Sequence, residues 1–285
     1  MTGRLRRTLL TVGAVVLFVA LAGATYQGVA TALERRRFPH PGRMLNVGGH
    51  QLHLDCEGDG APVVVLEAPA GGMSAAWGRV QQRVARTTRV CSYDRAGLGW
   101  SEWGERPYDP LIVPEQLHAL LVAAGEPMPY VLAGQELGAA LATLYASQFG
   151  DDLAALVLVD ERRSGEVTER RERATRLVDA SPWLARSGLL RATRVFSRRA
   201  AGLPGDAAGA LGAFLNRPDH LTRTSRELAR WDDAVNGAAG APLRAGLRVV
   251  HVDTGLREFQ FLTNPAQADL VSAAIEEAVT ASRAR

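Results

Sequence analysis

The sequence predicts an α/β protein: a doubly wound, mainly parallel sheet with a helical cap insertion and an N-terminal transmembrane helix. Three observations predict this class. Short apolar runs alternate with helical patterns up to residue 160, as in folds built from strand–helix–strand units. An Arg- and Ala-rich stretch without a strand pattern follows, over residues 161–246. A long uncharged run lies near the N-terminus, over residues 8–33.

Composition limits the classes of function. With 285 residues, of which 47% are hydrophobic and 22% charged, the chain can form a sizeable core. The net charge is only +3, which gives no support to a nucleic-acid partner. Cys56 and Cys91 are too few for a disulfide framework and lack metal-ligand spacing. We expect no nucleic acid, no metal and no cofactor, and the two cysteines form either one disulfide or two buried thiols.

Residues 1–34 predict a membrane segment. Arginines within residues 4–7 precede the uncharged run, and residues 8–30 are long enough to cross a lipid bilayer, which takes ~20 residues. A signal peptide cleaved near Ala24 is the alternative. The apolar run exceeds the usual ~7–15 residues of such peptides, so an uncleaved anchor is favoured. We expect a single-pass membrane protein whose domain lies on the extracytoplasmic side.

Residues 35–43 are expected to form a charged, proline-broken linker, and residues 44–160 the first part of the core. Two alternating runs flank Gly48-Gly49, which predicts a hairpin. The β-branched run at 63–67 is typical of a strand buried on both faces. The remaining pattern predicts strands at 88–94, 129–134 and 153–160, and helices at 75–85, 114–125 and 138–150.

Residues 161–246 are expected to form a helical cap, and residues 247–285 the C-terminal part of the core, with one strand at 247–253 and a final helix from Asn264. A basic amphipathic segment at 181–199 has two interpretations. It rests on anionic lipid beside the anchor, or it is a cap helix with its apolar side on the pocket and its Arg side in water. We favour the second.

Four stretches carry a resemblance to a known family: "VVVLEAPAGG", "YDRAGLGWS", "YVLAGQELGAALATLYA" and "LVLVDE". In this order and spacing they resemble the α/β-hydrolase fold family, in particular its membrane-anchored bacterial members with a helical cap. The resemblance covers residues 44–160 closely and residues 247–280 loosely. It implies a nucleophile elbow at 134–138, where a serine normally stands on a tight turn between a strand and a helix.

The resemblance also implies an oxyanion hole. Its donors would be the backbone N–H groups of Leu137 and Ala70, beside Gly71 and Gln135. Pro69 has no N–H and cannot serve. The reactive groups are what departs from the family pattern: Glu136 stands where the serine belongs, and Glu258 stands near the place of the general-base histidine.

None of the six histidines fits the position of the base. His251 is closest in sequence, but the pattern predicts a packed strand residue there. Asp253 is the candidate acid if its strand is the first of the two that the family has in this region, and Asp160 is a weaker candidate. Because nucleophile and base are missing together, the sequence favours an abandoned triad.

Glu136 has several interpretations. Dehalogenases and epoxide hydrolases use an aspartate at the elbow, so Glu136 is a candidate nucleophile, but it lacks a histidine to cleave the intermediate. Glu136 and Glu258 as paired glycosidase carboxylates receive less support. Our hypothesis is that Glu136 is held by the amides of the following helix and by Arg257.

Three functions remain open. The first is a catalytically inactive pseudo-hydrolase that binds a small apolar ligand or a protein partner. The second is a hydrolase of an ester or related bond that uses Glu136. The third is a structural membrane protein whose domain is a scaffold.

Overall fold

A computed structural model describes residues 3–104, 107–162, 169–256 and 260–284. Seven strands form one sheet in the order β1-β2-β4-β3-β5-β6-β7. The pairs from β4 through β7 are parallel, whereas β2 pairs with β1 and β4 in the antiparallel sense. This confirms the predicted mainly parallel sheet. The strands are β1 (Arg43–Val47), β2 (His50–Glu57), β3 (Val63–Glu67), β4 (Val90–Tyr93), β5 (Tyr130–Gln135), β6 (Leu153–Val159) and β7 (Arg248–Val252).

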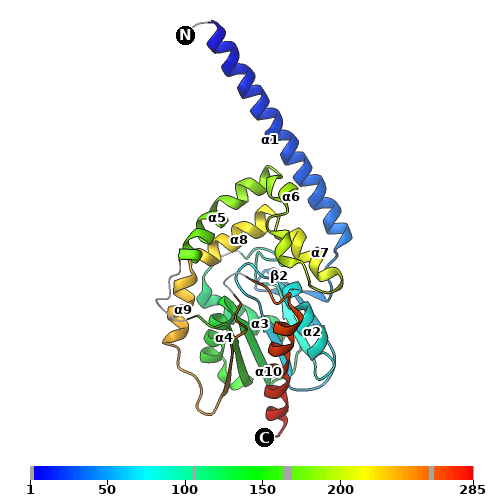
Figure 1. Cartoon of the computed structure of the whole chain (residues 1–285). Coiled ribbons are helices and arrows are strands. Elements are labelled where there is room, and N and C mark those ends of the chain that lie inside the picture. The colour runs from blue at the N-terminus through cyan, green and yellow to red at the C-terminus, as the bar shows by residue number, and fades with distance from the viewer. Residues whose placement is uncertain (1–2, 105–106, 163–168, 257–259, 285) are drawn as a thin grey trace.

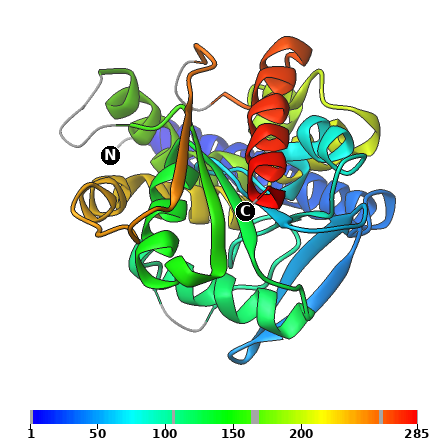
Figure 2. The same ribbon diagram turned by 90° about the horizontal axis from the view of Figure 1, so that it is seen from below.

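Helices cover both faces of the sheet (Figure 2). On one face lie α2 (Gly78–Val84) and α10 (Pro265–Arg283), and on the other α3 (Val113–Ala124) and α4 (Leu137–Gln148). Each face has its own apolar cluster: Val80 and Val271 belong to the first, and Leu120 and Ala142 to the second. The strands between them are almost fully buried, as the continuous apolar runs predict.

Between β6 and β7 the described residues form a group of helices that lies over one edge of the sheet (Figure 1). We call this group the α5–α9 segment. It contains α5 (Glu169–Arg186), α6 (Leu189–Thr193), α7 (Gly205–Phe214), α8 (Pro218–Ala229) and α9 (Trp231–Ala239), with a short 3₁₀ turn at Ser197–Ala200.

The sequence pattern predicted one helix over the amphipathic stretch at 181–199, but the structure has a break within it. Gly188 adopts φ 74° and separates α5 from α6, and Arg194 at φ 54° ends α6. A left-handed glycine is a common helix stop. The apolar spacing continues across this break, which is why the sequence pattern did not reveal it.

The N-terminal helix α1 (Gly3–Arg37) extends away from the domain (Figure 1). Its most apolar window has a mean hydropathy of 2.2 and is not buried at all, so by length and composition the helix can cross a membrane. It continues through Arg37, and the first three residues of the predicted linker are therefore helical.

The second half of α1 packs on the α5–α9 segment through polar contacts. Arg191 donates to Oε1 of Gln27 at 2.9 Å and to the hydroxyl of Thr31 at 3.3 Å, and it pairs with Glu34. Gln27 itself donates to the backbone oxygen of Asn216 at 2.9 Å. The polar residues that weaken the apolar run after residue 24 therefore serve this interface.

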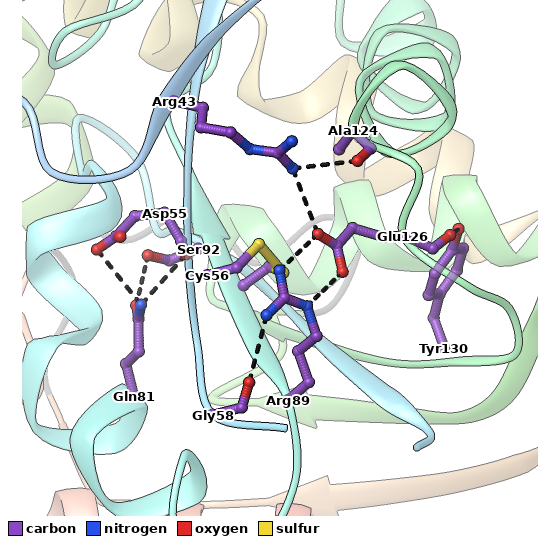
Figure 3. The surroundings of a disulfide bond; sticks show 11 residues. Arg43, Asp55, Cys56, Gly58, Gln81, Arg89, Ser92, Ala124, Glu126 and Tyr130 are labelled. Carbon is purple, nitrogen blue, oxygen red and sulfur yellow. Dashed lines mark hydrogen bonds and ion pairs between the residues drawn. A yellow bond between two sulfur atoms is a disulfide. The ribbon is translucent and has the colours of Figure 1, made fainter. Parts of the chain in front are cut away.

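A disulfide joins Cys56 of β2 to Cys91 of β4, which face each other in the strand register (Figure 3). Arg89 beside it donates to both carboxylate oxygens of Glu126, at 2.6 and 2.8 Å. The sequence left open whether the two cysteines form a disulfide or remain buried thiols, and the structure has the disulfide. Closing a loop of 35 residues stabilises a fold by about 2–4 kcal/mol. Because the two sulfurs are bonded to each other, they and Glu126 are not a metal site.

Candidate functional site

A sharp turn joins β5 to α4, and Glu136 stands at its tip. Glu136 has φ 57° and ψ −111°, a backbone conformation that is rare outside glycine and that a nucleophile elbow imposes. The residue is only 3% exposed. The structure thus has the elbow geometry that the resemblance implies, with a buried carboxylic side chain in place of a serine.

Two glycines permit this turn. A Cβ on Gly134 would lie 2.2 Å from the carbonyl oxygen of Gly138, and a Cβ on Gly138 would lie 2.4 Å from that of Glu67. Both distances are far below van der Waals contact, and the groups opposite are rigid backbone. The second contact also places the end of β3 directly against the elbow.

Leu137, the first residue of α4, belongs to an apolar cluster that covers the elbow. Ala70 from the loop after β3 is in the same cluster, together with Leu228 of α8 and Trp231 of α9. The predicted pocket residues Ala70 and Leu137 are therefore brought together, beneath the α5–α9 segment. Gln135 is buried, and its amide donates to the backbone oxygen of Gln260 at 3.3 Å.

Helix α8 holds the loop after β3 at two points. The backbone N–H of Gly71 donates to Oε2 of Glu227 at 2.9 Å, and its carbonyl oxygen lies 3.0 Å from Nε2 of His220. One amide of the loop expected to form the oxyanion hole is therefore already bonded to a carboxylate of the protein itself.

Arg95 connects this contact to the end of β3. Its Nη1 lies 2.5 Å from a carboxylate oxygen of Glu67, and its Nε lies 2.8 Å from one of Glu227. The Tyr93 hydroxyl donates to Glu67, and Arg223 lies 3.5 Å from Glu227. We call these five residues the Arg95 cluster. All are nine-tenths buried or more, and two guanidinium groups balance two carboxylates.

The charges of this cluster are fixed by its pairing. Burial raises the pKa of Glu67, and Arg95 only partly offsets that effect. Burial acts in the same direction on Glu227, but Arg95, Arg223 and the Gly71 amide outweigh it and lower the pKa of Glu227. The carboxylates in turn outweigh burial at Arg95 and raise its pKa. Glu227 and Arg95 are therefore a permanent ion pair across the contact between α8 and the loop.

His220 is buried beside the same loop, but both of its ring nitrogens are occupied. Gly99 N–H donates to Nδ1 at 3.2 Å, so Nε2 carries the proton and donates to Gly71. Burial lowers the pKa of His220, which agrees with a neutral ring. Because both ring nitrogens are bonded, His220 holds the loop in place and is not available as a general base.

A second histidine lies beside a serine and an aspartate. Nδ1 of His53 is 3.4 Å from the Ser74 hydroxyl and 3.1 Å from Oδ2 of Asp94. In a catalytic triad serine and carboxylate bind different nitrogens, whereas here they share one. The other nitrogen, Nε2, lies 2.6 Å from the carbonyl oxygen of Pro41. Burial alone would lower the pKa of His53, but Asp94 raises it, so the ring donates on both sides and cannot take a proton from Ser74.

The other described histidines lie in different surroundings. His118 of α3 stacks on Phe149 and contacts Asp152. His251 lies in β7 as predicted, but it is not packed: its side chain is 65% exposed and lies 3.1 Å from Glu161, because β7 is the edge strand. His40 and His50 line a cavity described below.

The candidate acids have local partners. Both carboxylate oxygens of Asp160 accept bonds from Thr254, at 2.7 and 2.8 Å. Asp253 is exposed and accepts from the backbone of Gly255. Among the described residues one strand, β7, lies between β6 and α10. Glu258 and Arg257, the predicted base position and the predicted partner of Glu136, lie outside the described residues.

Glu136 lines neither of two cavities that lie around Trp100. The first, of about 370 Å³, is lined by apolar residues near Trp100 and α7 and by polar residues of β2 and α2. We call it the α7 cavity; its lining includes Phe38, Pro41, Asp55, Ser74, Pro204 and Ala207. The second, of about 810 Å³, is lined by aromatic rings and by Arg35, His50, Arg217 and Asp219. Burial lowers the pKa of Arg217 to about 10.

Comparison with solved structures identifies the architecture. The haloalkane dehalogenase DatA from Agrobacterium tumefaciens C58 superposes with a TM-score of 0.62 at 15% identity, covering 84% of this chain and 96% of that one. An α/β-hydrolase fold protein from Burkholderia ambifaria gives a TM-score of 0.60 at 19% identity, over 74% of this chain and 79% of that one. The epoxide hydrolase CorEH gives 0.60 at 16% identity, over 74% and 81%.

The chain has the α/β-hydrolase fold. At these identities the likeness concerns the fold alone. No family model matches the sequence. The Bacillus subtilis protein YbdG is 23% identical over 158 residues, 55% of this chain and 49% of YbdG. An uncharacterized vacuolar membrane protein of Saccharomyces cerevisiae is 26% identical over 129 residues, 39% of this chain and 20% of its own length. The chain thus spans about half or less of these relatives.

Sequence reasoning missed the Arg95 cluster. Within this α/β-hydrolase fold, Glu67 ends β3 and Arg95 follows β4, its parallel neighbour. Ends of adjacent parallel strands meet at one edge, so that much was available from the predicted strands. Glu227 and Arg223 lie some 130 residues further on, in a helix whose position the sequence does not give.

Proposed function

We propose that the protein is a membrane-anchored pseudo-hydrolase: a catalytically inactive α/β-hydrolase-fold protein that binds a small apolar ligand. The observation that carries this proposal is Glu136, which occupies the strained tip of a complete elbow where the nucleophilic hydroxyl belongs. An oxyanion hole without a nucleophile leaves at most roughly 10³–10⁴-fold acceleration over water.

The histidines support inactivity as well. An elbow acid can act as a nucleophile only if a base then activates the water that cleaves the ester. His220 and His53 are the buried rings next to the loop after β3, and neither has a nitrogen free to accept a proton. In the Arg95 cluster, Glu227 of α8 forms an ion pair with Arg95 and accepts a hydrogen bond from Gly71 of the loop after β3, so α8, which we regard as part of the cap, is held in place.

The ligand site we propose is the α7 cavity. Its volume of about 370 Å³ falls within the ~300–1,000 Å³ usual for small-molecule sites. Aromatic, proline and alanine residues contribute to its lining, and Ser74, Gln81 and Asp55 are among the residues that add polar atoms. This combination suits a small, largely apolar molecule with one polar group.

We further propose that α1 is an uncleaved anchor and that the domain is extracytoplasmic. The length and hydropathy of α1 and the relative named as a vacuolar membrane protein support membrane association. The Cys56–Cys91 disulfide supports an extracytoplasmic position of the domain, because structural disulfides persist in oxidising compartments and are rare in the cytosol.

The ligand proposal predicts a stabilisation by small aromatic molecules. The full chain in amphipol, heated with indole or 2-naphthol at about ten times the dissociation constant, should gain about 1.4 kcal/mol and unfold about 2–3 °C higher. Ala207→Phe fills the α7 cavity and should abolish this gain. Ala201→Phe is the control, because Ala201 is exposed and outside the cavity lining. Equal gains in both variants would refute the site.

A hydrolase that uses Glu136 is the second candidate. The strained φ of Glu136 favours it, because a turn kept under strain is a usual mark of function. The structural neighbours named epoxide hydrolase and haloalkane dehalogenase suggest which bonds to test. Turnover of an aryl ester, epoxide or haloalkane by the purified chain, lost in Glu136→Ala, would establish this candidate.

A further inference from the structure

The corner between α5 and α6 contacts α1 at residues 23–26. We define the α5–α6 corner as residues 183–195. A Cβ on Gly23 would lie 2.2 Å from the carbonyl oxygen of Ser187, and one on Gly188 would lie 2.9 Å from the ring of Tyr26. These approaches leave no room for another layer between the two helices. The corner is therefore fixed on α1 at residues 23–26.

The length of α1 then places the corner relative to a bilayer. From Thr8, the first residue after the N-terminal arginines, to Gly23 there are 16 residues, which rise about 24 Å. The hydrocarbon core of a bilayer is about 30 Å thick, and the headgroup regions bring the total to about 40–45 Å. A helix that enters the core at Thr8 is therefore still about 6 Å short of the second headgroup region at Gly23, so the corner lies near the boundary between core and headgroups. Tilt shortens the projection of the helix on the bilayer normal and places the corner deeper in the bilayer.

The exposed side chains of the corner suit that depth. Trp183 is 74% exposed, Leu189 51% and Val195 49%. The apolar surface continues along α1, where Phe18 is 72% and Leu21 59% exposed. Tryptophan is enriched at membrane interfaces, where an apolar ring meets polar headgroups. An exposed apolar patch beside the exposed membrane helix has a bilayer as its natural cover.

The charges of the corner point to lipid phosphates. The Arg186 guanidinium lies 4.9 Å from the centre of the Trp183 ring, and Arg194 and Arg198 are exposed nearby in the chain. No aspartate or glutamate occurs between residues 180 and 205. A surface with exposed arginines and no acid of its own is attracted to an anionic leaflet.

We propose that the α5–α6 corner is a second membrane contact, which inserts Trp183 and Leu189 into the interface of an anionic leaflet and pairs Arg186 and Arg194 with lipid phosphates. This inference rests on the proposed anchoring by α1. Because Arg191 bonds to Gln27, Thr31 and Glu34, the corner and the anchor form one unit. The α5–α9 segment is then held against the membrane, between bilayer and sheet.

The test uses the full chain in nanodiscs of phosphatidylglycerol and phosphatidylcholine, with bromine on the lipid acyl chains near the headgroup. Bromine quenches only tryptophans that touch lipid. Of the five tryptophans, Trp77 and Trp231 are buried. We expect quenching of about one fifth of the emission, lost in Trp183→Phe and kept in Trp103→Phe, the control for the other exposed tryptophan at 38% exposure. Quenching that survives in Trp183→Phe overturns the proposal.

Two further experiments test separately the role of the arginines and the anchoring by α1. Arg186→Gln with Arg194→Gln should lower the quenching in anionic discs towards the level found in discs of phosphatidylcholine alone. Resistance of the chain to alkaline carbonate extraction tests the anchor by itself. A chain that is extracted refutes the anchoring by α1. A chain that resists extraction but shows no quenching of Trp183 refutes only the corner, whose patch then faces water or a protein.

Discussion

Glu136 has the backbone conformation of an elbow nucleophile and the side chain of an acid. The turn is kept by two glycines that no other residue can replace without a backbone clash. The shape of the site is therefore preserved by steric necessity, while its chemistry depends on a side chain that sterics do not fix. The backbone of the elbow is thus set by the connection between β5 and α4, whichever side chain stands at its tip.

His53 provides a test of the buried polar groups by pH. Asp94 raises its pKa above the ordinary 6.5 against the effect of burial, and Asp55 adds to this rise. A group with a raised folded-state pKa stabilises the fold fully below its unfolded pKa, and that contribution is lost as the pH rises through the folded value. We expect the difference in unfolding free energy between the natural chain and His53→Gln to shrink from pH 6 towards pH 9.

Denaturant unfolding at several pH values measures this difference. Other titrating groups are common to both proteins and largely cancel. A difference that stays constant or grows with pH would show that His53 is not held as the cation paired with Asp94.

At the scale of elements, α8 is the helix that organises the site. It supplies Glu227 and His220 to the loop after β3, and its neighbour α9 supplies Trp231 to the cluster above Leu137. The contact thus combines an ion pair, two bonds to Gly71 and an apolar seal. Such a contact fixes the α5–α9 segment in one position above the elbow.

Glu227→Gln should loosen this contact. The change keeps the shape of the side chain but removes the charge that balances Arg223 and half of Arg95, and breaking a buried pair costs about 3–5 kcal/mol. Asp233→Asn is the control: it breaks an exposed pair with Arg230, worth about 1 kcal/mol or less. Chemical denaturation of both variants measures the costs. Equal costs would mean that the Arg95 cluster does not hold α8.

The strands and the core helices could be predicted from the sequence because their signals are local. The β-branched run of β3 and the proline and glycine at the ends of α3 each act within a few residues. The Arg95 cluster could not be predicted from the sequence, because Glu227 lies 132 residues from Arg95 along the chain. The break at Gly188 was missed for a different reason: apolar spacing on both sides continues the same helical period across it.

At the scale of the whole molecule, α1 and the α5–α9 segment belong together. Polar residues in the second half of α1 bond to Arg191 and Asn216, so α1 is joined directly to the α5–α9 segment at that point. The α7 cavity is lined by residues from the end of α1, the linker, α2 and α7. Its lining therefore depends on how α1 packs on the domain, which links the proposed ligand to the proposed membrane position.

We propose that Glu136 does not act as a nucleophile, and the mass of the peptide that contains Glu136 tests this proposal. An elbow carboxylate that opens an epoxide or displaces a halide forms an ester, and water that cleaves this ester at the acyl carbon of the protein leaves its oxygen on the carboxylate. The full chain is incubated in H₂¹⁸O with a terminal epoxide or a haloalkane and then digested. We predict an unchanged mass for the peptide. A gain of about 2 Da per exchanged oxygen, or a substrate adduct on Glu136, would contradict the account.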